Sequence, residues 1–336
     1  MKIKVGINGM GRIGRMIVRS IVENKYSNFE IKHINNRTNT ETCSNLLKFD
    51  SIHGRFNAEV KFDQNNLMVN KNKITFSQEM DINKINWEKF GVDYVFECTG
   101  KFNSKDKLMP HLKNGAKKVI VSAPCKDADK TIVFGVNEKE IKEEDKIISA
   151  ASCTTNCLAP VAYVLNENFG IDKGFMTTIH SFTSDQRILD NSHKDPRRAR
   201  SASQSIIPTS TGASKAIGEI IPSLKGKLEG IAMRVPTPNV SLIDLTFVSK
   251  KKTNIEKINQ LIVNSSKTKN LKNILTVNKL PLVSIDFNHN PSSSIFDLTQ
   301  TQVINEKFCR ILSWYDNEWG FSNRMIETMM NLKKFI

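Results

Sequence analysis

The sequence has no run of 18 or more apolar residues, so it offers no candidate for a helix that crosses a membrane. Its first residues alternate and then turn at once, without the longer apolar stretch and the small-residue cleavage site of a secretory signal. It also lacks internal repeats and low-complexity linkers, so its parts are expected to pack tightly. These absences lead us to expect a cytoplasmic protein.

Cysteine is sparse, with six residues scattered over a chain of 336, which argues against a disulfide framework. Cys153 and Cys157 do not form a CxxC pair, and no second pair of ligands follows at the spacing of a zinc site. The sequence therefore predicts no metal site.

Acidic residues are too few to balance the basic ones, and the formal charge is +15. Such a charge favours anionic partners, either nucleic acid or a phosphorylated substrate with a phosphorylated cofactor. The basic residues are dispersed, and the densest groups are residues 250–252 and 197–200. We attribute most of the excess to solvated surface lysines, and nucleic acid is not expected as the main partner.

Hydrophobic residues make up 39% of the chain, enough for a substantial core, and its length favours two domains. In the first half, strand-like segments at residues 3–7, 29–34, 94–98 and 118–122 alternate with helical ones at 13–23 and 105–114. This β-α-β rhythm predicts an α/β Rossmann domain with a doubly wound parallel sheet.

The pattern changes near residue 150. Strand-like segments at 174–181, 231–235 and 241–249 are separated by few helices, at 154–169 and 214–221. They predict an α+β catalytic domain with a mixed sheet over residues 153–316. A last amphipathic helix joins residues 317–336 to a dinucleotide-binding domain formed by 1–152.

The first strand runs directly into Gly9-Met10-Gly11-Arg12-Ile13-Gly14, a GxGxxG motif in its required context before a helix. Gly9 permits the tight turn, Gly11 lets the backbone approach a pyrophosphate, and Gly14 lets helix and strand pack closely. A merely structural glycine turn is the less favoured interpretation.

The second strand should end in an acid that binds the ribose hydroxyl groups of NAD. It ends instead in Asn36 and Arg37, and no carboxylate follows before Glu41.

Cys153 lies where small and hydroxyl residues lead into an apolar helix. A helix N-terminus favours a thiolate and offers backbone N–H groups to an oxyanion. His180 follows a strand and is the best candidate of six histidines for its base. Cys157, one turn further along, fits a packing role.

Seven segments, in order and spacing, resemble glyceraldehyde-3-phosphate dehydrogenases of the phosphorylating type over nearly the whole chain. They are NGMGRIGR (8–15), SAASCTTNC (149–157), HSFTSDQ (180–186), RRAR (197–200), TGASKA (211–216), RVPTP (234–238) and SWYDNEWG (313–320).

The resemblance implies that Cys153 attacks the aldehyde of D-glyceraldehyde 3-phosphate, with His180 as base. A thioester then forms, and inorganic phosphate releases 1,3-bisphosphoglycerate. Further residues are expected to hold the substrate phosphate and the attacking phosphate: Thr183 and Arg234 for the first, and Ser152, Arg198, Thr211 and Gly212 for the second. Thr154 is expected among these substrate- and phosphate-binding residues, without assignment to either phosphate. Arginines and hydroxyl groups suit such anion sites.

For the cofactor, the resemblance adds residues to the three glycines: Arg12, Ile13, Thr99, Ser122 and Asn317, the last orienting the nicotinamide carboxamide. It also implies a homotetramer, in which residues 182–203 form a loop at a subunit interface and reach the neighbouring cofactor.

The chain departs from NAD-using members of the family at Asn36 and Arg37, at Asn191-Ser192 where Leu-Pro is usual, and at Phe321 in place of a tyrosine. Asn36 removes a carboxylate that repels a 2′-phosphate, Arg37 adds a cation, and Ser192 matches photosynthetic NADP-using relatives. We therefore expect NADP or NAD as cofactor, with NADP favoured, and use in glycolysis or in the reverse, biosynthetic direction.

Two alternatives remain open. Erythrose-4-phosphate dehydrogenase shares the cysteine but usually lacks the TGASKA type of phosphate segment. A non-catalytic RNA-binding or scaffold role is suggested by the charge, but the intact catalytic set weighs against it as the main function.

Overall fold

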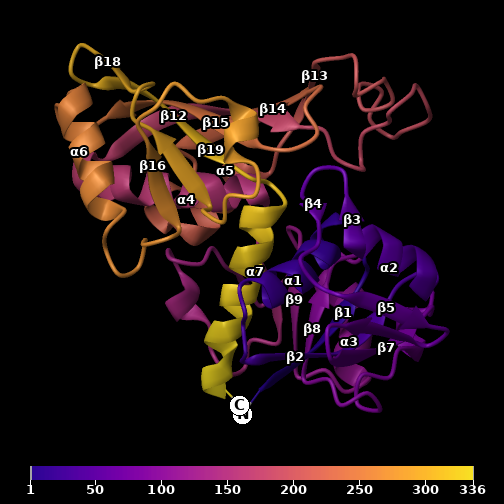
Figure 1. Ribbon diagram of the computed structural model, residues 1–336. Helices are drawn as coiled ribbons and strands as arrows, with labels where there is room; N and C mark the ends of the chain where they lie inside the picture. The colour runs from indigo at the N-terminus through magenta and orange to yellow at the C-terminus, as the bar shows by residue number, and fades with distance from the viewer. Residues whose placement is uncertain (1, 336) are drawn as a thin grey trace. The chain divides into compact units, whose positions relative to one another are not determined.

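The computed structural model describes residues 2–335, which divide into two compact units (Figure 1). The first unit consists of residues 2–132, 138–151 and 322–335, and the second of Val133–Asn137 and Ser152–Phe321. Among residues 2–335, no helix is long and apolar enough to cross a membrane.

The first unit is built on a nine-stranded sheet whose order is β10-β11-β9-β8-β1-β2-β7-β6-β5. Neighbours from β10 to β7 run parallel, and β6 and β5 add an antiparallel edge. The strands are β1 (Ile3–Asn8), β2 (Phe29–Asn35), β5 (Val60–Asp63), β6 (Asn66–Val69), β7 (Asn72–Ser77), β8 (Tyr94–Glu97), β9 (Lys118–Val121), β10 (Lys130–Thr131) and β11 (Ile147–Ser149). A short hairpin, β3 (Phe49–Asp50) and β4 (Gly54–Arg55), lies apart from the sheet.

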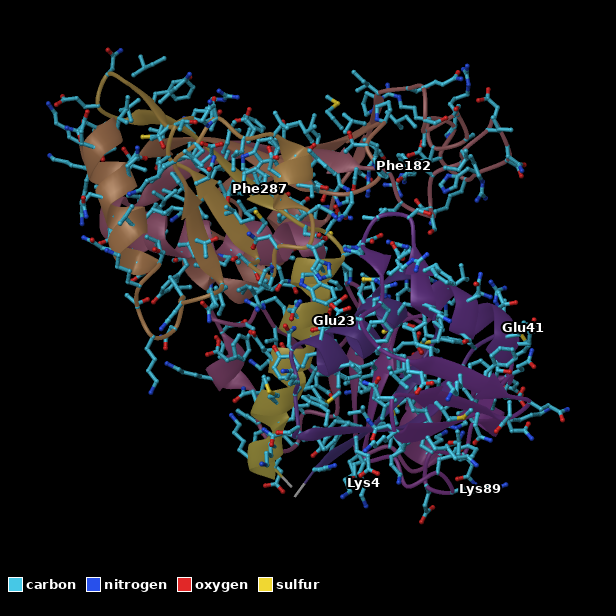
Figure 2. All side chains as sticks on the ribbon, viewed as in Figure 1. Lys4, Glu23, Glu41, Lys89, Phe182 and Phe287 are labelled. Atoms are coloured by element: carbon cyan, nitrogen blue, oxygen red, sulfur yellow. The ribbon has the colours of Figure 1, made fainter. Side chains whose placement is uncertain are left out.

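Helices α1 (Arg12–Glu23), α2 (Thr40–Lys48) and α3 (Lys105–Lys113) belong to this unit, as does most of α7 (Trp319–Asn331). The helix α2 begins where the side chain of Asn39 accepts a hydrogen bond from the N–H of Thr42. In α7, Met325 and Met329 are fully buried, as the apolar stripe of the sequence predicted. Figure 2 shows Lys4 and Lys89 at the outer edge of the unit, where both are exposed.

The second unit has an eight-stranded mixed sheet with the order β13-β14-β12-β15-β19-β17-β16, and β18 pairs with β19. The strands are β12 (Ile171–Ser181), β13 (Ile207–Ser210), β14 (Leu228–Val235), β15 (Ser241–Ser249), β16 (Leu275–Asn278), β17 (Ser294–Asp297), β18 (Gln302–Ile304) and β19 (Phe308–Tyr315). The pairs β12–β14 and β16–β17 are parallel, and the other pairs are antiparallel. The predicted α/β fold with a Rossmann domain and a mixed-sheet domain is confirmed.

Helices α4 (Cys153–Phe169), α5 (Ala213–Ile220) and α6 (Ile255–Ser265) pack against this second sheet. Alternation along β12 turns Met176, Thr178 and His180 inward and Phe175 outward, where Phe175 is 74% exposed. Ile231 of β14 is also exposed. A long loop from Phe182, labelled in Figure 2, leads to β13 and extends away from the sheet.

Candidate active site

The nucleophile predicted from the sequence is the first residue of α4. Ser152 caps this helix, because its hydroxyl oxygen accepts a hydrogen bond from the N–H of Thr155 at 3.0 Å. The sulfur of Cys153 lies 3.4 Å from Nε2 of His180, near the end of β12. The structure therefore brings together the two residues that sequence reasoning paired.

The contacts of Nδ1 of His180 bear on its tautomer. Nδ1 lies 2.7 Å from the carbonyl oxygen of Ser181, to which it can donate, and 2.8 Å from Nη1 of Arg234, from which it can only accept. The tautomer that donates to Ser181 is the one that leaves Nε2 as an acceptor toward Cys153. Burial, and then the charge of Arg234, lower the pKa of His180 to about 3. Burial raises the pKa of Cys153, an effect that Arg234 and the N–H of Thr154 oppose. The pair thus rests as a thiol beside a neutral imidazole that can take its proton.

Arg234 is opposite His180 because β12 and β14 pair in that register. Its Nη1 donates to the carbonyl oxygen of Ser181 at 3.0 Å and lies 2.8 Å from Nδ1 of His180. Its Nε is buried and has no hydrogen-bond partner among the described residues. A buried donor without a partner in an otherwise close-packed unit fits an anion that supplies the missing acceptor.

Tyr315 connects the nucleophile to its base, and sequence reasoning missed it. Its hydroxyl group bonds to Thr154 of α4 at 2.8 Å and to Thr178 of β12 at 2.9 Å. Its ring meets the imidazole of His180 edge to face, with centroids 5.9 Å apart. Burial raises its pKa well above the ordinary value, so the phenol remains protonated. The only signal in the sequence was its place in the SWYDNEWG segment.

Thr154 is buried, and its hydroxyl group is directed to Tyr315 rather than to solvent. Thr183 is held by a second residue that the sequence did not reveal, the buried Gln186. The side-chain oxygen of Gln186 accepts from both the N–H and the hydroxyl group of Thr183, at 2.8 and 3.1 Å. The turn at residues 183–186 therefore fixes the backbone and the side chain of Thr183.

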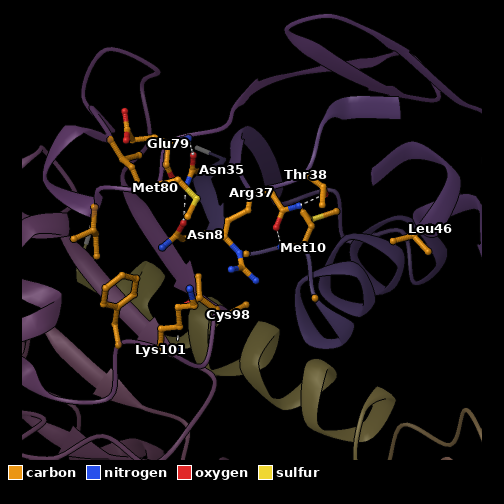
Figure 3. Close-up of a pocket in the computed structure, with 17 residues that line it drawn as sticks. Asn8, Met10, Asn35, Arg37, Thr38, Leu46, Glu79, Met80, Cys98 and Lys101 are labelled. Carbon is orange, nitrogen blue, oxygen red and sulfur yellow. Dashed lines mark hydrogen bonds between the residues drawn. The ribbon is translucent and has the colours of Figure 1, made fainter. Parts of the chain in front are cut away.

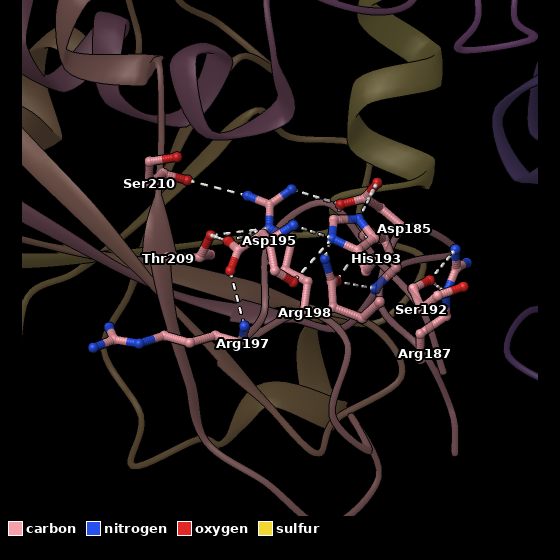
Figure 4. A network of polar contacts seen from close by, with 11 residues as sticks. Asp185, Arg187, Ser192, His193, Asp195, Arg197, Arg198, Thr209 and Ser210 are labelled. Atoms are coloured by element: carbon pink, nitrogen blue, oxygen red, sulfur yellow. Dashed lines mark hydrogen bonds and ion pairs between the residues drawn. The ribbon is translucent and has the colours of Figure 1, made fainter. Parts of the chain in front are cut away.

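Arg198 is the centre of a polar network in the loop that follows β12 (Figure 4). Its Nη1 binds the carboxylate of Asp185 at 2.5 Å, and its Nε donates to Thr209 at 2.9 Å. Burial alone would raise the pKa of Asp185, but the hydrogen bond and the charge of Arg198 outweigh it and lower the pKa. The guanidinium group is thus held in place before any ligand arrives.

Gly212 precedes α5 with ordinary backbone angles, and a Cβ added to it would meet no atom within 4 Å. Neither conformation nor packing requires glycine there. Thr211, beside it, accepts a hydrogen bond from the N–H of Ala213. Open space at a glycine of a helix N-terminus fits the close approach of an anion to the backbone.

A second site lies in the first unit, at the carboxyl ends of β1, β2 and β8. It is a pocket of about 270 Å³, shown in Figure 3 with Arg37 pointing into it. Its walls combine strand ends, the glycine turn and a few apolar side chains: Asn8, Gly9, Met10, Gly11, Asn35, Asn36, Arg37, Thr38, Leu46, Glu79, Met80, Ile82, Ile85, Cys98, Thr99, Lys101 and Phe102. The carboxyl ends of parallel strands are where doubly wound sheets bind their ligands.

The structure explains the presence of glycine differently at the three positions of the turn. Gly9 has a φ of 98°, and a Cβ on Gly14 would lie 2.0 Å from the carbonyl oxygen of Gly9. A Cβ on Gly11 would meet nothing within 4 Å, and its φ is −70°. The folded chain needs glycine at the first two positions, whereas at Gly11 only a ligand close to the backbone would need it.

Asn36 is held at both ends of its amide. Its oxygen accepts from the N–H of Met10 at 3.1 Å, and its nitrogen donates to Thr38 at 2.7 Å. Arg37, the next residue, is exposed.

Other residues expected at the cofactor are not part of the wall of this pocket. Arg12 binds Asp50 through both Nη atoms, at 2.5 and 3.0 Å. Ile13, Gly14 and Ser122 are not among the residues that line the pocket. Ser192 lies in the exposed loop of the second unit, where its carbonyl oxygen accepts from Arg187.

Asn317 also belongs to the second unit, and it is buried. Its side-chain oxygen accepts from the hydroxyl groups of Ser181 at 2.9 Å and Ser241 at 3.1 Å. These two donors fix the orientation of the amide.

A Rossmann unit and a unit with a cysteine in contact with a buried histidine are together typical of a dehydrogenase that works through a covalent thiol intermediate. Comparison with known proteins narrows this class. Residues 3–105 match the glyceraldehyde 3-phosphate dehydrogenase NAD binding domain, and residues 152–317 match the C-terminal domain of the same enzymes.

Curated relatives match over the full length. The glyceraldehyde-3-phosphate dehydrogenase of Xanthobacter flavus is 52% identical over 334 residues, which cover 99% of each chain. Those of Cereibacter sphaeroides and Geobacillus stearothermophilus are each 50% identical, over 100% and 97% of each chain. The chain belongs to the glyceraldehyde-3-phosphate dehydrogenase family.

Proposed function

We propose that the protein catalyses the reversible oxidative phosphorylation of D-glyceraldehyde 3-phosphate to 1,3-bisphosphoglycerate, with NADP or NAD as hydride acceptor. One observation carries the proposal: Cys153 and His180 are in contact, beside Arg234, whose buried Nε has no hydrogen-bond partner among residues 2–335. The names of the relatives agree with this reaction.

The chemistry follows from the pair. The sulfur of Cys153 attacks the aldehyde carbon while Nε2 of His180 takes the thiol proton and passes it to the aldehyde oxygen, which gives a thiohemiacetal on Cys153. When bound, the nicotinamide cofactor supplies the hydride acceptor. Loss of the hydride, and of the hydroxyl proton to Nε2 of His180, leaves a thioester on Cys153. Inorganic phosphate attacks the thioester carbon, the C–S bond breaks to release the acyl phosphate, and the sulfur of Cys153 takes the proton back from His180.

Two anion sites support this sequence of steps. Arg234 and Thr183 hold the substrate phosphate, and the unpartnered Nε of Arg234 supports that assignment. Arg198, Thr211 and Gly212, with Ser152, hold the attacking phosphate, which the open space at Gly212 supports.

The pocket of the first unit is proposed as the cofactor site, with Gly9, Gly11, Asn36, Arg37 and Thr99 in its wall. The residues fit a dinucleotide, because a Cβ on Gly11 would fill space that the folded chain leaves open. We favour NADP over NAD. Arg37 provides a cation for a 2′-phosphate, and the strand end carries an amide where a carboxylate would repel that phosphate.

Asn317 would orient the nicotinamide carboxamide with the amide nitrogen that its two hydroxyl donors leave available. Ser192 would reach the cofactor of a neighbouring subunit.

A homotetramer in the cytoplasm is part of the proposal. One face of the second sheet exposes Phe175 and Ile231, and the loop after β12 exposes Ile188 and Leu189. Apolar patches of this kind mark interaction surfaces. Mass measurement in solution by light scattering tests the assembly.

The decisive experiment compares initial rates with NAD and NADP, using D-glyceraldehyde 3-phosphate with and without inorganic phosphate. We expect acyl phosphate formation that depends on phosphate, and that arsenate can replace phosphate in cofactor reduction. Turnover of erythrose 4-phosphate without phosphate would instead indicate the sister dehydrogenase, and no turnover with either sugar phosphate would refute the proposed reaction.

A further inference from the structure

Glu97, the last residue of β8, carries a buried carboxyl group with no lysine or arginine paired to it among residues 2–335. Its side chain is 1% exposed. One oxygen accepts from Asn8 Nδ2 at 2.7 Å and from His111 Nε2 at 3.0 Å. The other accepts from the N–H and the hydroxyl group of Thr99, at 2.7 and 2.5 Å. Four neutral donors therefore surround it.

The donors show which form of the group is present. Asn8 Nδ2 and the N–H of Thr99 can only donate. Nδ1 of His111 accepts from Trp87 Nε1 at 2.9 Å, so the proton of the neutral imidazole is on Nε2 and points to Glu97. These contacts match a carboxylate. An ion buried without a counter-ion is costly, and hydrogen bonds to it are the contacts that can offset the cost.

The hydrogen bonds that reach Glu97 form a one-way chain along one edge of the sheet. Ser77 donates to Asn35 at 2.8 Å, Asn35 donates to Asn8 at 2.9 Å, and Asn8 donates to Glu97. Each of these residues ends a strand: β7, β2, β1 and β8, which are neighbours in the sheet. Asn8 and Asn35 also line the pocket of Figure 3. The chain therefore runs beneath the floor of that pocket.

Thr99 connects Glu97 to the glycine turn. A Cβ on Gly9 would lie 2.9 Å from both the backbone nitrogen and Cγ2 of Thr99. The turn that opens at Gly9 is thus in close contact with the residue that Glu97 holds by two hydrogen bonds. A shift of Thr99 would move one wall of the pocket against the other.

We infer that Glu97 is a positioning residue for the dinucleotide, which rests on the proposed function in taking this pocket as the cofactor site. Its carboxylate holds Asn8 and Thr99, and through them it fixes the distance between the glycine turn and the loop after β8. It touches neither cofactor nor substrate. It therefore acts on cofactor binding and leaves the chemistry at Cys153 unchanged.

The test is Glu97→Gln, which keeps the shape and removes the charge. Whichever way the new amide turns, its NH₂ faces a group that can only donate, Asn8 Nδ2 or the N–H of Thr99. We expect the KM for NAD and for NADP to rise about tenfold, with kcat within about threefold, and the Kd for ADP-ribose to rise in parallel. Glu327→Gln is the matched control, because Glu327 is a largely buried carboxylate of the same unit that pairs with Arg324. Loss of the Glu327 charge should change the melting temperature and leave the KM for NAD and for NADP unchanged.

A melting temperature lowered as in the control, with an unchanged KM, would overturn the inference. If Glu97→Gln does not fold, His111→Leu replaces it, because it withdraws one donor from Glu97 without lining the pocket; an unchanged cofactor KM would again overturn it. Gly11→Ala separates this outcome from failure of the proposed site. If Gly11→Ala binds ADP-ribose as the unmodified protein does, the pocket itself is wrongly assigned, and the inference falls with it.

Discussion

Nη1 of Arg234 lies 2.8 Å from Nδ1 of His180 and 3.0 Å from the carbonyl oxygen of Ser181, which Nδ1 of His180 also approaches to 2.7 Å. The residue proposed to hold the substrate phosphate is thus in contact with the base that serves the nucleophile. The charge of Arg234 also helps to lower the pKa of His180. Neutralising this charge by a bound phosphate should raise the basicity of the imidazole at the moment when the substrate is present.

Arg234→Leu should chiefly weaken binding and turnover of D-glyceraldehyde 3-phosphate. Loss of a charged hydrogen bond is worth roughly 1.5–3 kcal/mol, so the KM should rise about ten- to a hundredfold. Steady-state kinetics with saturating phosphate measure it. The pH profile of Cys153 alkylation by iodoacetamide should also change. A variant with wild-type kinetics for the sugar phosphate would refute the assignment.

Arg198→Leu should chiefly raise the requirement for inorganic phosphate. Its guanidinium group belongs to the network of Asp185 and Thr209, apart from the carbonyl of Ser181 that Arg234 shares with the base. We expect the KM for phosphate to rise about ten- to a hundredfold. The two arginines are wrongly assigned if Arg198→Leu and Arg234→Leu respond identically to both ligands.

Cys153→Ala should abolish turnover and acyl-enzyme formation, since the sulfur of Cys153 is the one that lies 3.4 Å from Nε2 of His180. Cys157→Ser should fold and keep most activity, because the sulfur of Cys157 is buried against Ser294 and the backbone. His180→Asn should slow the reaction by roughly 10²–10⁴, the usual worth of a general base. Mass spectrometry of the trapped acyl-enzyme and single-turnover rates check these outcomes. An active Cys153→Ala protein would exclude this nucleophile.

Asn36→Asp combined with Arg37→Leu should shift preference strongly from NADP toward NAD. The new carboxylate could still accept from the N–H of Met10, as the amide oxygen does now. It would repel a 2′-phosphate, and the cation beside it would be gone. The ratio of kcat/KM for the two cofactors measures the effect. A much higher kcat/KM for NAD than for NADP in the unmodified protein would show that the site was misinterpreted.

His33 should make the protein less stable in mild acid. Burial lowers its pKa to about 4, so it stays neutral in the folded state while the unfolded chain takes up a proton below about 6.5. The unfolded state then binds more protons, and stability falls as pH drops from about 6.5 to 4. The full effect is roughly 3 kcal/mol. Melting temperatures across this range should fall less for His33→Gln than for the unmodified protein, with His53→Gln as control. Equal slopes in all three would contradict the explanation.

Periodicity predicted the elements that position the chemistry. The segment expected as a strand at residues 3–7 is β1, and the helix expected at 154–169 is α4, which begins one residue earlier at Cys153. Such elements can be predicted from their own residues, because a strong apolar pattern lies next to a glycine turn in one case and a capping serine in the other. The hairpin of β5 and β6 was not predicted, because its short strands are stabilised by pairing with each other and of β6 with β7 rather than by a pattern of their own.

The sequence predicted the residues of the candidate site that are proposed to contact substrate or phosphate directly. It did not predict the residues that hold those side chains in place. Cys153, His180 and the arginines are chemically distinctive in a sequence. Tyr315 and Glu97 acquire their roles from partners far along the chain, such as Asn8 for Glu97, which only folding brings within hydrogen-bonding distance. A single sequence carries no record of such pairs.

The open space at Gly11 and Gly212 has a consequence for how mutations in this protein would be detected. Alanine at either position enlarges the side chain without a clash in the folded chain. A screen that selects for expression or heat resistance would therefore accept both replacements. A screen that selects for turnover would reject them, so the difference between the two screens would mark the places where ligands approach the backbone.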